Sequence, residues 1–241
     1  MSTALLLPGQ AAAPPGPADM TMMYVMHHAF RRDVADFAAA IEATPVADVR
    51  RWSLLLDRWR RFAHELHVHH SKEDEVLWPL LLQRVRAAED TEAERVLQEM
   101  EEEHAVIDPL LARATGAFQH LAAGGEPSAH ELLCDTISRF GATLDRHLGH
   151  EESAAIEILQ RYVGGAEWAT LERTRFRPRQ SIGEARFFIP WAVKGLPEDA
   201  LRQVMALGGP PLRVLHAVSR RRFARDEEEV FGPVSGRRPA A

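Results

Sequence analysis

The sequence predicts an all-α protein, an up-down four-helix bundle with a short helical C-terminal extension packed on it. Three observations predict this fold. Between residues 20 and 163, apolar residues recur at spacings of three and four, which is the period of an amphipathic helix. Turn-forming residues interrupt this pattern three times, so it divides into four helices. After residue 163 the chain remains rich in aromatic residues, but prolines break it into pieces too short to build a core of their own.

These patterns divide the chain into four parts. Residues 1–19 are rich in Ala, Pro and Gly and are expected to form a flexible leader. Residues 20–163 form the bundle. Residues 164–225 form the helical extension, and the acidic residues that begin the segment 226–241 are expected to start a frayed tail.

Each break within the bundle has its own turn chemistry. At Thr44–Pro45, we expect Thr44 to cap a helix whose first residue is the proline. A weakly apolar stretch at 89–91 separates the second helix from the third. The turn residues 124–127 precede a capping box at 128–131, which predicts the start of the fourth helix. The glycine pair at 164–165 closes that helix.

Composition and charge restrict the classes of partner. The net charge of −6 argues against nucleic acid, and the basic stretch 220–225 is expected to be a solvated helix end. The chain contains no run of about 18 apolar residues and no basic segment before an apolar one at its start. We therefore expect no membrane span and a cytoplasmic location. Because Cys134 is the single cysteine, a metal site would depend on nitrogen and oxygen ligands.

The strongest signal is an internal repeat, Phe-x3-Leu-x2-His-x3-Glu. One copy ends on His69 and Glu73 in the second helix, and the other ends on His147 and Glu151 in the fourth. Residues three, four and seven apart share a helix face, so each His–Glu pair lies on the same side as core-facing Phe and Leu. A buried carboxylate is costly unless it is paired or bound to a metal. Two such pairs that face each other therefore predict a cation site.

The first and third helices each add one histidine to an apolar stripe. His27 shares its stripe with Phe30, and His104 shares its stripe with Ile107. A lone histidine of this kind is more often an ordinary core or surface residue. Four histidines in register with two repeated glutamates instead favour a metal site. The histidines beside the stripe are expected to be exposed: His64, His67, His70 and His150.

The sequence resembles the hemerythrin and HHE cation-binding family. The resemblance covers residues 20–163 and rests on four motifs: His27 in H-x2-F-R-R, H-x3-E followed by L-W-P-L at 77–80, Glu103-His104, and the second H-x3-E. The final third resembles an extension seen in actinobacterial hemerythrin-like proteins. In the family, the matching positions bind two irons that the carboxylates bridge. The resemblance therefore implies these ligands here: His27, His69, Glu73, His104, His147 and Glu151.

The number of ligands leaves space for a small molecule. Two six-coordinate ions offer about twelve positions, of which four His and two bridging Glu fill about eight. The cofactor implied is two iron ions (Fe2+/Fe3+) with an oxo or hydroxo bridge. Tyr24 could donate to a metal-bound ligand or simply pack, and His28 replaces His27 if the helical register shifts by one. Asp108 stands where oxygen-carrying hemerythrins have a further histidine, and it could be a seventh ligand or an ordinary residue outside the site. Those proteins also have Asp at the position of Glu151. Simple oxygen carriage is therefore not what the resemblance implies.

These inferences predict a di-iron protein that reacts with or senses oxygen, nitric oxide or peroxide. One alternative is an enzyme that removes peroxide or repairs damaged iron centres, and another is a structural bundle that holds zinc or no metal. No general base outside the ligand set is identifiable, so the sequence does not decide whether the protein is an enzyme. The expected partner is a small diatomic molecule or peroxide, with neither nucleic acid nor membrane, and the C-terminal extension could also bind a protein.

Overall fold

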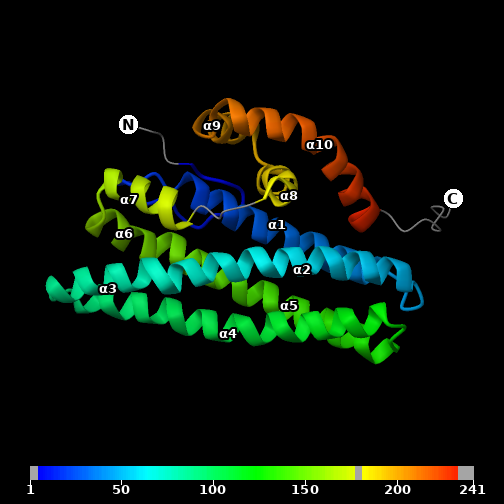
Figure 1. The fold of residues 1–241 in the computed structure, drawn as a ribbon. Coiled ribbons are helices and arrows are strands. Elements are labelled where there is room, and N and C mark those ends of the chain that lie inside the picture. The colour runs from blue at the N-terminus through cyan, green and yellow to red at the C-terminus, as the bar shows by residue number, and fades with distance from the viewer. Residues whose placement is uncertain (1–4, 177–180, 233–241) are drawn as a thin grey trace.

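The computed structural model describes residues 5–176 and 181–232, which form helices and no strand (Figure 1). The all-α prediction is confirmed. Two of the four bundle helices continue through a short π-helical segment. The bundle consists of α1 (Thr21–Ala43), α2 (Val49–Lys72) with η1 (Glu73–Leu77) and α3 (Trp78–Ala87), α4 (Thr91–Ala122), and α5 (Pro127–His150) with η2 (Glu151–Ala155) and α6 (Ile156–Tyr162).

Aromatic rings hold the four helices together at one level of the bundle. Each helix supplies one ring that is 0% exposed: Phe37, Trp59, Phe118 and Phe140. Trp59 contacts the other three, with ring centroids 5.1 to 5.6 Å apart. Ten residues separate Trp59 from His69, which corresponds to about 15 Å along the helix. The aromatic layer therefore fixes the packing of the bundle without occupying the region of the predicted ligands.

Two helix starts differ from the prediction. Asp48 caps α2 by accepting a hydrogen bond from the Arg51 backbone at 3.0 Å, so the helix begins after Pro45 rather than at it. Thr44 instead ends α1 and donates its hydroxyl to the Ala40 carbonyl. The capping box at 128–131 does not form, because Pro127 is already the first residue of α5. The break before α4 lies where it was expected, with Asp90 as its cap.

The leader lies against the bundle rather than free of it. Residues 5–20 form no helix, as their composition predicts, yet Leu5 and Leu7 are buried. The side-chain amide of Gln160 bonds both backbone groups of Ala18 at 2.9 Å. Further along, the Ala11 N–H donates to Glu152 at 2.7 Å. These contacts join segments more than 140 residues apart, which the local composition could not indicate.

The extension contains α7 (Gly165–Leu171), η3 (Glu172–Phe176), α8 (Ile182–Val193), α9 (Glu198–Leu207) and α10 (Gly209–Phe231). Helices α8 to α10 form a layer over the bundle on the side of α1 and α2 (Figure 1). The acidic residues from 226 were expected to fray, but they belong to α10. Glu227 is only 8% exposed and pairs with Arg58 at 2.8 Å, which explains why the helix continues. In the described part of the chain, no helix is long and apolar enough to cross a bilayer.

A buried ion network anchors this layer. Arg58 on α2, which is 4% exposed, pairs with Asp33 on α1 and with Glu227 on α10. The indole N–H of Trp191 on α8 donates to the same Asp33 carboxylate at 2.8 Å. Three charged groups and one indole thus join α1, α2, α8 and α10. Because one unpaired member would leave a buried charge, the network couples the docking of the extension to the packing of the bundle.

Candidate metal centre

Two π-helical segments carry the repeated glutamates. Glu73 is the first residue of η1, and Glu151 is the first residue of η2. Single π turns inside α-helices are frequent at functional sites, because the extra residue re-aims side chains. Pro79 contributes to the first turn, since its ring clashes with the carbonyl four residues earlier and it has no N–H. The second turn contains no proline. The two copies of the repeat therefore share a π turn that begins at the glutamate.

One group of potential ligands comes from three bundle helices. His27, His69, Glu73 and Glu151 are all buried, and each offers a ligand atom within 4.8 Å of the others. The His27 Nε2 lies 3.1 Å from a Glu151 oxygen. The His69 Nε2 lies 3.2 Å from Glu73 Oε1. We call these four residues the first group.

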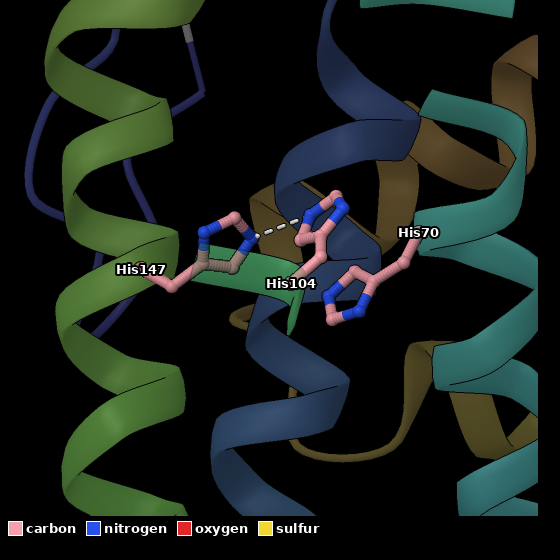
Figure 2. Close-up of side chains that lie close together, drawn as sticks. All are labelled: His70, His104 and His147. Atoms are coloured by element: carbon pink, nitrogen blue, oxygen red, sulfur yellow. Dashed lines mark hydrogen bonds between the residues drawn. The ribbon is translucent and has the colours of Figure 1, made fainter. Parts of the chain in front are cut away.

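A second group consists of His70, His104 and His147, which are also buried and within the same mutual distance (Figure 2). They come from α2, α4 and α5, and their rings converge. The Nε2 atoms of His104 and His147 lie 3.1 Å apart. The His70 ring stacks on His104 with centroids 4.0 Å apart. Three imidazoles thus gather without any carboxylate of their own in the group.

His70 corrects the sequence interpretation, which expected it to be exposed. It is 3% exposed, and neither ring nitrogen forms a hydrogen bond with a described residue. The stripe of the repeat was assigned to His69, seven residues after Phe62. His70 lies four residues after Leu66 and fits the same periodicity. The site is wide enough that two adjacent residues of α2 both face it, one toward each group.

The spacing of the donor atoms suits binding to a metal ion better than hydrogen bonding between the donors. Two donors that bind one ion at about 2.1 Å stand about 3.0–3.4 Å apart, which matches the closest contacts in both groups. Glu73 and Glu151 are 0% exposed, and none of their oxygens accepts a hydrogen bond of ordinary geometry from the described residues. Such carboxylates would be costly in a core without a cation. The set of buried nitrogens and oxygens therefore suits metal binding.

The outward nitrogens of three histidines are held by carboxylates. The Nδ1 contacts are His27 to Glu152 at 2.9 Å, His104 to Asp74 at 2.8 Å and His147 to Glu103 at 2.8 Å. A carboxylate at Nδ1 fixes the ring and leaves Nε2 to face a metal, as is usual for metal-binding histidines. Sequence reasoning missed Asp74 and Glu152 in this role, although each directly follows a repeated glutamate.

Burial and neighbouring charges divide the pKa values within the site. Burial lowers the pKa of His69 to about 3 and that of His70 well below its usual value. Burial would also lower the pKa of His27, but the charges of Glu151 and Glu152 raise it to about 9. Burial raises the pKa of Glu73 well above its usual value, and the Glu151 and Asp74 charges add to this. Burial alone would raise the pKa of Glu151 too, but His27 lowers it to about 2. Without metal, the charge of the first group is thus concentrated in the His27–Glu151 pair.

The other candidates lie outside both groups. Asp108 is exposed on α4, so the structure does not place it among the ligands. His28 is half-buried and lies beside Gly195 of the extension instead of facing the first group. His64 and His67 are exposed, as expected. His150 is half-buried and contacts Glu103 at 2.9 Å.

Residues 19–159 match the family model described as the Hemerythrin HHE cation binding domain. The matched segment covers more than half of the chain and includes every residue of both groups. No match to a curated protein or to a solved structure reaches significance.

Proposed function

The chain belongs to the hemerythrin HHE cation-binding family, and we propose that it holds two iron ions side by side in its core. We propose further that this pair binds or senses dioxygen, nitric oxide or peroxide. Bound iron would supply redox and Lewis-acid chemistry to such a molecule.

The arrangement of one carboxylate carries the proposal of a pair. Glu73 Oε1 lies 3.2 Å from the Nε2 of His69 in the first group, and Glu73 Oε2 lies 3.7 Å from the Nε2 of His104 in the second. Each oxygen therefore faces a different group of histidines. A carboxylate in this position suits a bridge between two ions better than it suits a single ion.

The number of ligands, rather than their chemical type, favours an iron pair over a single structural zinc ion. Imidazole and carboxylate suit iron and zinc alike, but thiolates are absent from both groups. A structural zinc site is usually closed by four ligands around one ion. Seven side chains shared between two groups exceed that requirement. The experiment must therefore distinguish bound iron from bound zinc.

The two groups differ in the number of histidines. The first contains His27 and His69, and the second contains His70, His104 and His147. If both glutamates bridge, the ion in the first group receives fewer protein ligands, so that side would accept a small exogenous molecule. The ligand side chains of the first group are 0 to 9% exposed. This burial excludes large substrates and bulk water, and it favours a molecule of two or three atoms.

Optical spectroscopy tests the proposal. The purified chain is loaded with ferrous iron without oxygen, freed of excess metal, and then exposed separately to dioxygen, nitric oxide and hydrogen peroxide. We expect two irons per chain and a new near-ultraviolet or visible band with at least one of the three. The zinc-loaded chain serves as a spectroscopically silent control. Iron-loaded protein whose spectrum responds to none of them would contradict the proposed function.

A further inference from the structure

Tyr24 on α1 is a buried tyrosine whose hydroxyl has no hydrogen-bond partner among the described residues. Its side chain is 4% exposed, and the hydroxyl oxygen is sealed from solvent without a hydrogen bond to any described residue. Most buried hydroxyls are hydrogen-bonded, because an unpaired one loses its interaction with water and gains nothing in return. Tyr24 therefore needs an explanation beyond packing.

The position of Tyr24 associates it with the first group. It precedes His27 by three residues, which is about 4.5 Å along the same face of α1. Glu152 lies against this face of α1, where it contacts His27 at 2.9 Å and Arg31 at 2.6 Å. Burial raises the pKa of the Tyr24 phenol above its usual range, and the charges of Glu152 and Glu151 add to this. The phenol therefore keeps its proton, and its place on the helix turn before His27 puts it on the side of α1 that faces the first group.

Neither neighbouring carboxylate is hydrogen-bonded to the Tyr24 hydroxyl, which has no partner among the described residues. Glu152 receives hydrogen bonds from His27, from Arg31 and from the Ala11 backbone. Glu151 contacts His27 and is a member of the first group. Glu151 would be held by the metal, so the free phenol donor is available to a ligand bound on this side of the pair.

We propose that Tyr24 donates a hydrogen bond to the small ligand that binds on the His27 side of the metal pair, and that it selects for ligands carrying negative charge. This inference rests on the proposed function. An anionic acceptor such as azide or hydroperoxide gains most from a phenol donor, because hydrogen bonds to charged groups are the stronger ones. A neutral ligand without a basic lone pair gains little. Tyr24 would act as a specificity-determining residue.

The test compares Tyr24→Phe with Tyr162→Phe in the iron-loaded protein. Tyr162 is the other tyrosine of the chain, and its hydroxyl donates to Asp90 at 2.8 Å, away from both groups. Azide serves as the probe, and its affinity is measured by absorbance. We expect Tyr24→Phe to keep two irons while azide affinity falls about tenfold or more, and Tyr162→Phe to leave azide affinity unchanged. In wild-type protein, the infrared stretch of bound azide should shift between H2O and D2O, and Tyr24→Phe should abolish that shift.

Several results would overturn the inference. Unchanged azide affinity with a retained isotope shift in Tyr24→Phe would mean that the phenol only packs. A visible phenolate-to-iron band that Tyr24→Phe removes would make Tyr24 a metal ligand rather than a donor. Wild-type protein with two irons that binds no azide would also overturn it, and the metal pair would still stand. A chain that takes up no pair of ions would overturn the proposed function together with the inference.

Discussion

Glu73 and Glu151 occupy equivalent positions in the two copies of the repeat, yet their surroundings move their pKa values in opposite directions. Burial dominates at Glu73 and raises its pKa, whereas the nearby His27 charge holds the pKa of Glu151 at about 2. In the metal-free site His27 thus holds a proton at neutral pH, and burial favours a proton on Glu73. Both protons compete with cations for the same atoms.

We predict that metal uptake releases protons and strengthens as the pH rises. With a pKa of about 9, His27 is protonated at pH 7, and it must become neutral before it binds a metal. Each proton displaced should change the apparent affinity about tenfold per pH unit below that pKa. Competition titrations with zinc at pH 6, 7 and 8 measure the slope, and calorimetry in two buffers counts the protons. Affinity that does not change over this range would contradict the assigned protonation of His27.

His70 provides the sharpest substitution at this scale. His70→Ala removes one of the three imidazoles of the second group but leaves the first group complete. We expect its iron content to fall from two toward one per chain. His67→Ala, an exposed neighbour on the same helix, should keep both ions. Two irons bound to His70→Ala with wild-type affinity would show that the buried imidazole is not a ligand.

Much of the candidate site could be predicted from the residues. The structure places His27, His69, Glu73 and Glu151 in the first group, and places His104 and His147 in the second. Periodicity missed His70 because it predicts about one core-facing residue per helical turn. Between the four helices, however, two adjacent residues of α2 both face the site. Periodicity also could not find the carboxylates at Nδ1, since their contacts depend on neighbouring helices.

Among the elements, the contact between α1, α2 and the extension depends on the buried network around Arg58. Asp33→Asn removes one of its two charge partners. We expect the variant to lose about 3 kcal/mol of unfolding free energy, because Arg58 remains buried beside Glu227 alone. Asp57→Asn breaks an exposed Asp–Arg pair with 72% and 54% exposed side chains, and should cost less than about 1 kcal/mol. Urea unfolding of both variants measures the difference, and equal losses would remove the network's assigned role.

The buried Asp33–Arg58 pair also predicts that the docked extension loses stability in acid. Burial would raise the pKa of Asp33, but the charges of Arg58 and Arg32 and the bond from Trp191 hold it below its usual value. A carboxyl whose folded pKa is depressed contributes stability above its unfolded pKa of about 3.9, and that stability is lost as the pH falls through the folded value. Wild-type protein should lose this contribution only below about pH 4. Asp33→Asn should lack it at every pH.

The helices themselves were predictable where periodicity is strong, but their ends and interruptions were less so. Pro45 and the 128–131 box are both typical of a helix start. In the structure, however, Asp48 caps α2 and Pro127 is the first residue of α5. The π turns leave the His-x3-Glu spacing unchanged, so the pattern cannot reveal them. The packed leader depends on Glu152 and Gln160, which are distant in sequence.

In the whole molecule, two aromatic contacts connect the extension to the candidate metal centre. Trp191 on α8 packs against Phe30 with ring centroids 5.8 Å apart, and Phe30 packs against the His69 ring at 5.2 Å. The Phe30 ring therefore lies between His69 and Trp191 of the extension and contacts both. This continuity offers a physical route by which the extension could respond to the site.

Truncation after Gly165 tests the role of this layer. The shortened chain would expose Phe30 and leave Arg58 without Glu227, so we expect aggregation in light scattering and a lower melting temperature. All seven candidate ligands precede the cut, so any soluble fraction should still bind iron. A soluble monomer with an unchanged melting temperature would mean that the extension is independent of the bundle.

We propose that one buried carboxylate, Glu73, joins two groups of histidines around a pair of ions. Diffraction from iron-loaded crystals at the iron absorption edge tests it most directly, because anomalous peaks locate each ion without assumptions about its ligands. We expect two peaks about 3.5–4 Å apart on either side of Glu73. One peak should lie beside His27 and His69, and the other beside His70, His104 and His147. A single peak, or iron bound only outside these groups, would rule out a pair of ions joined by Glu73.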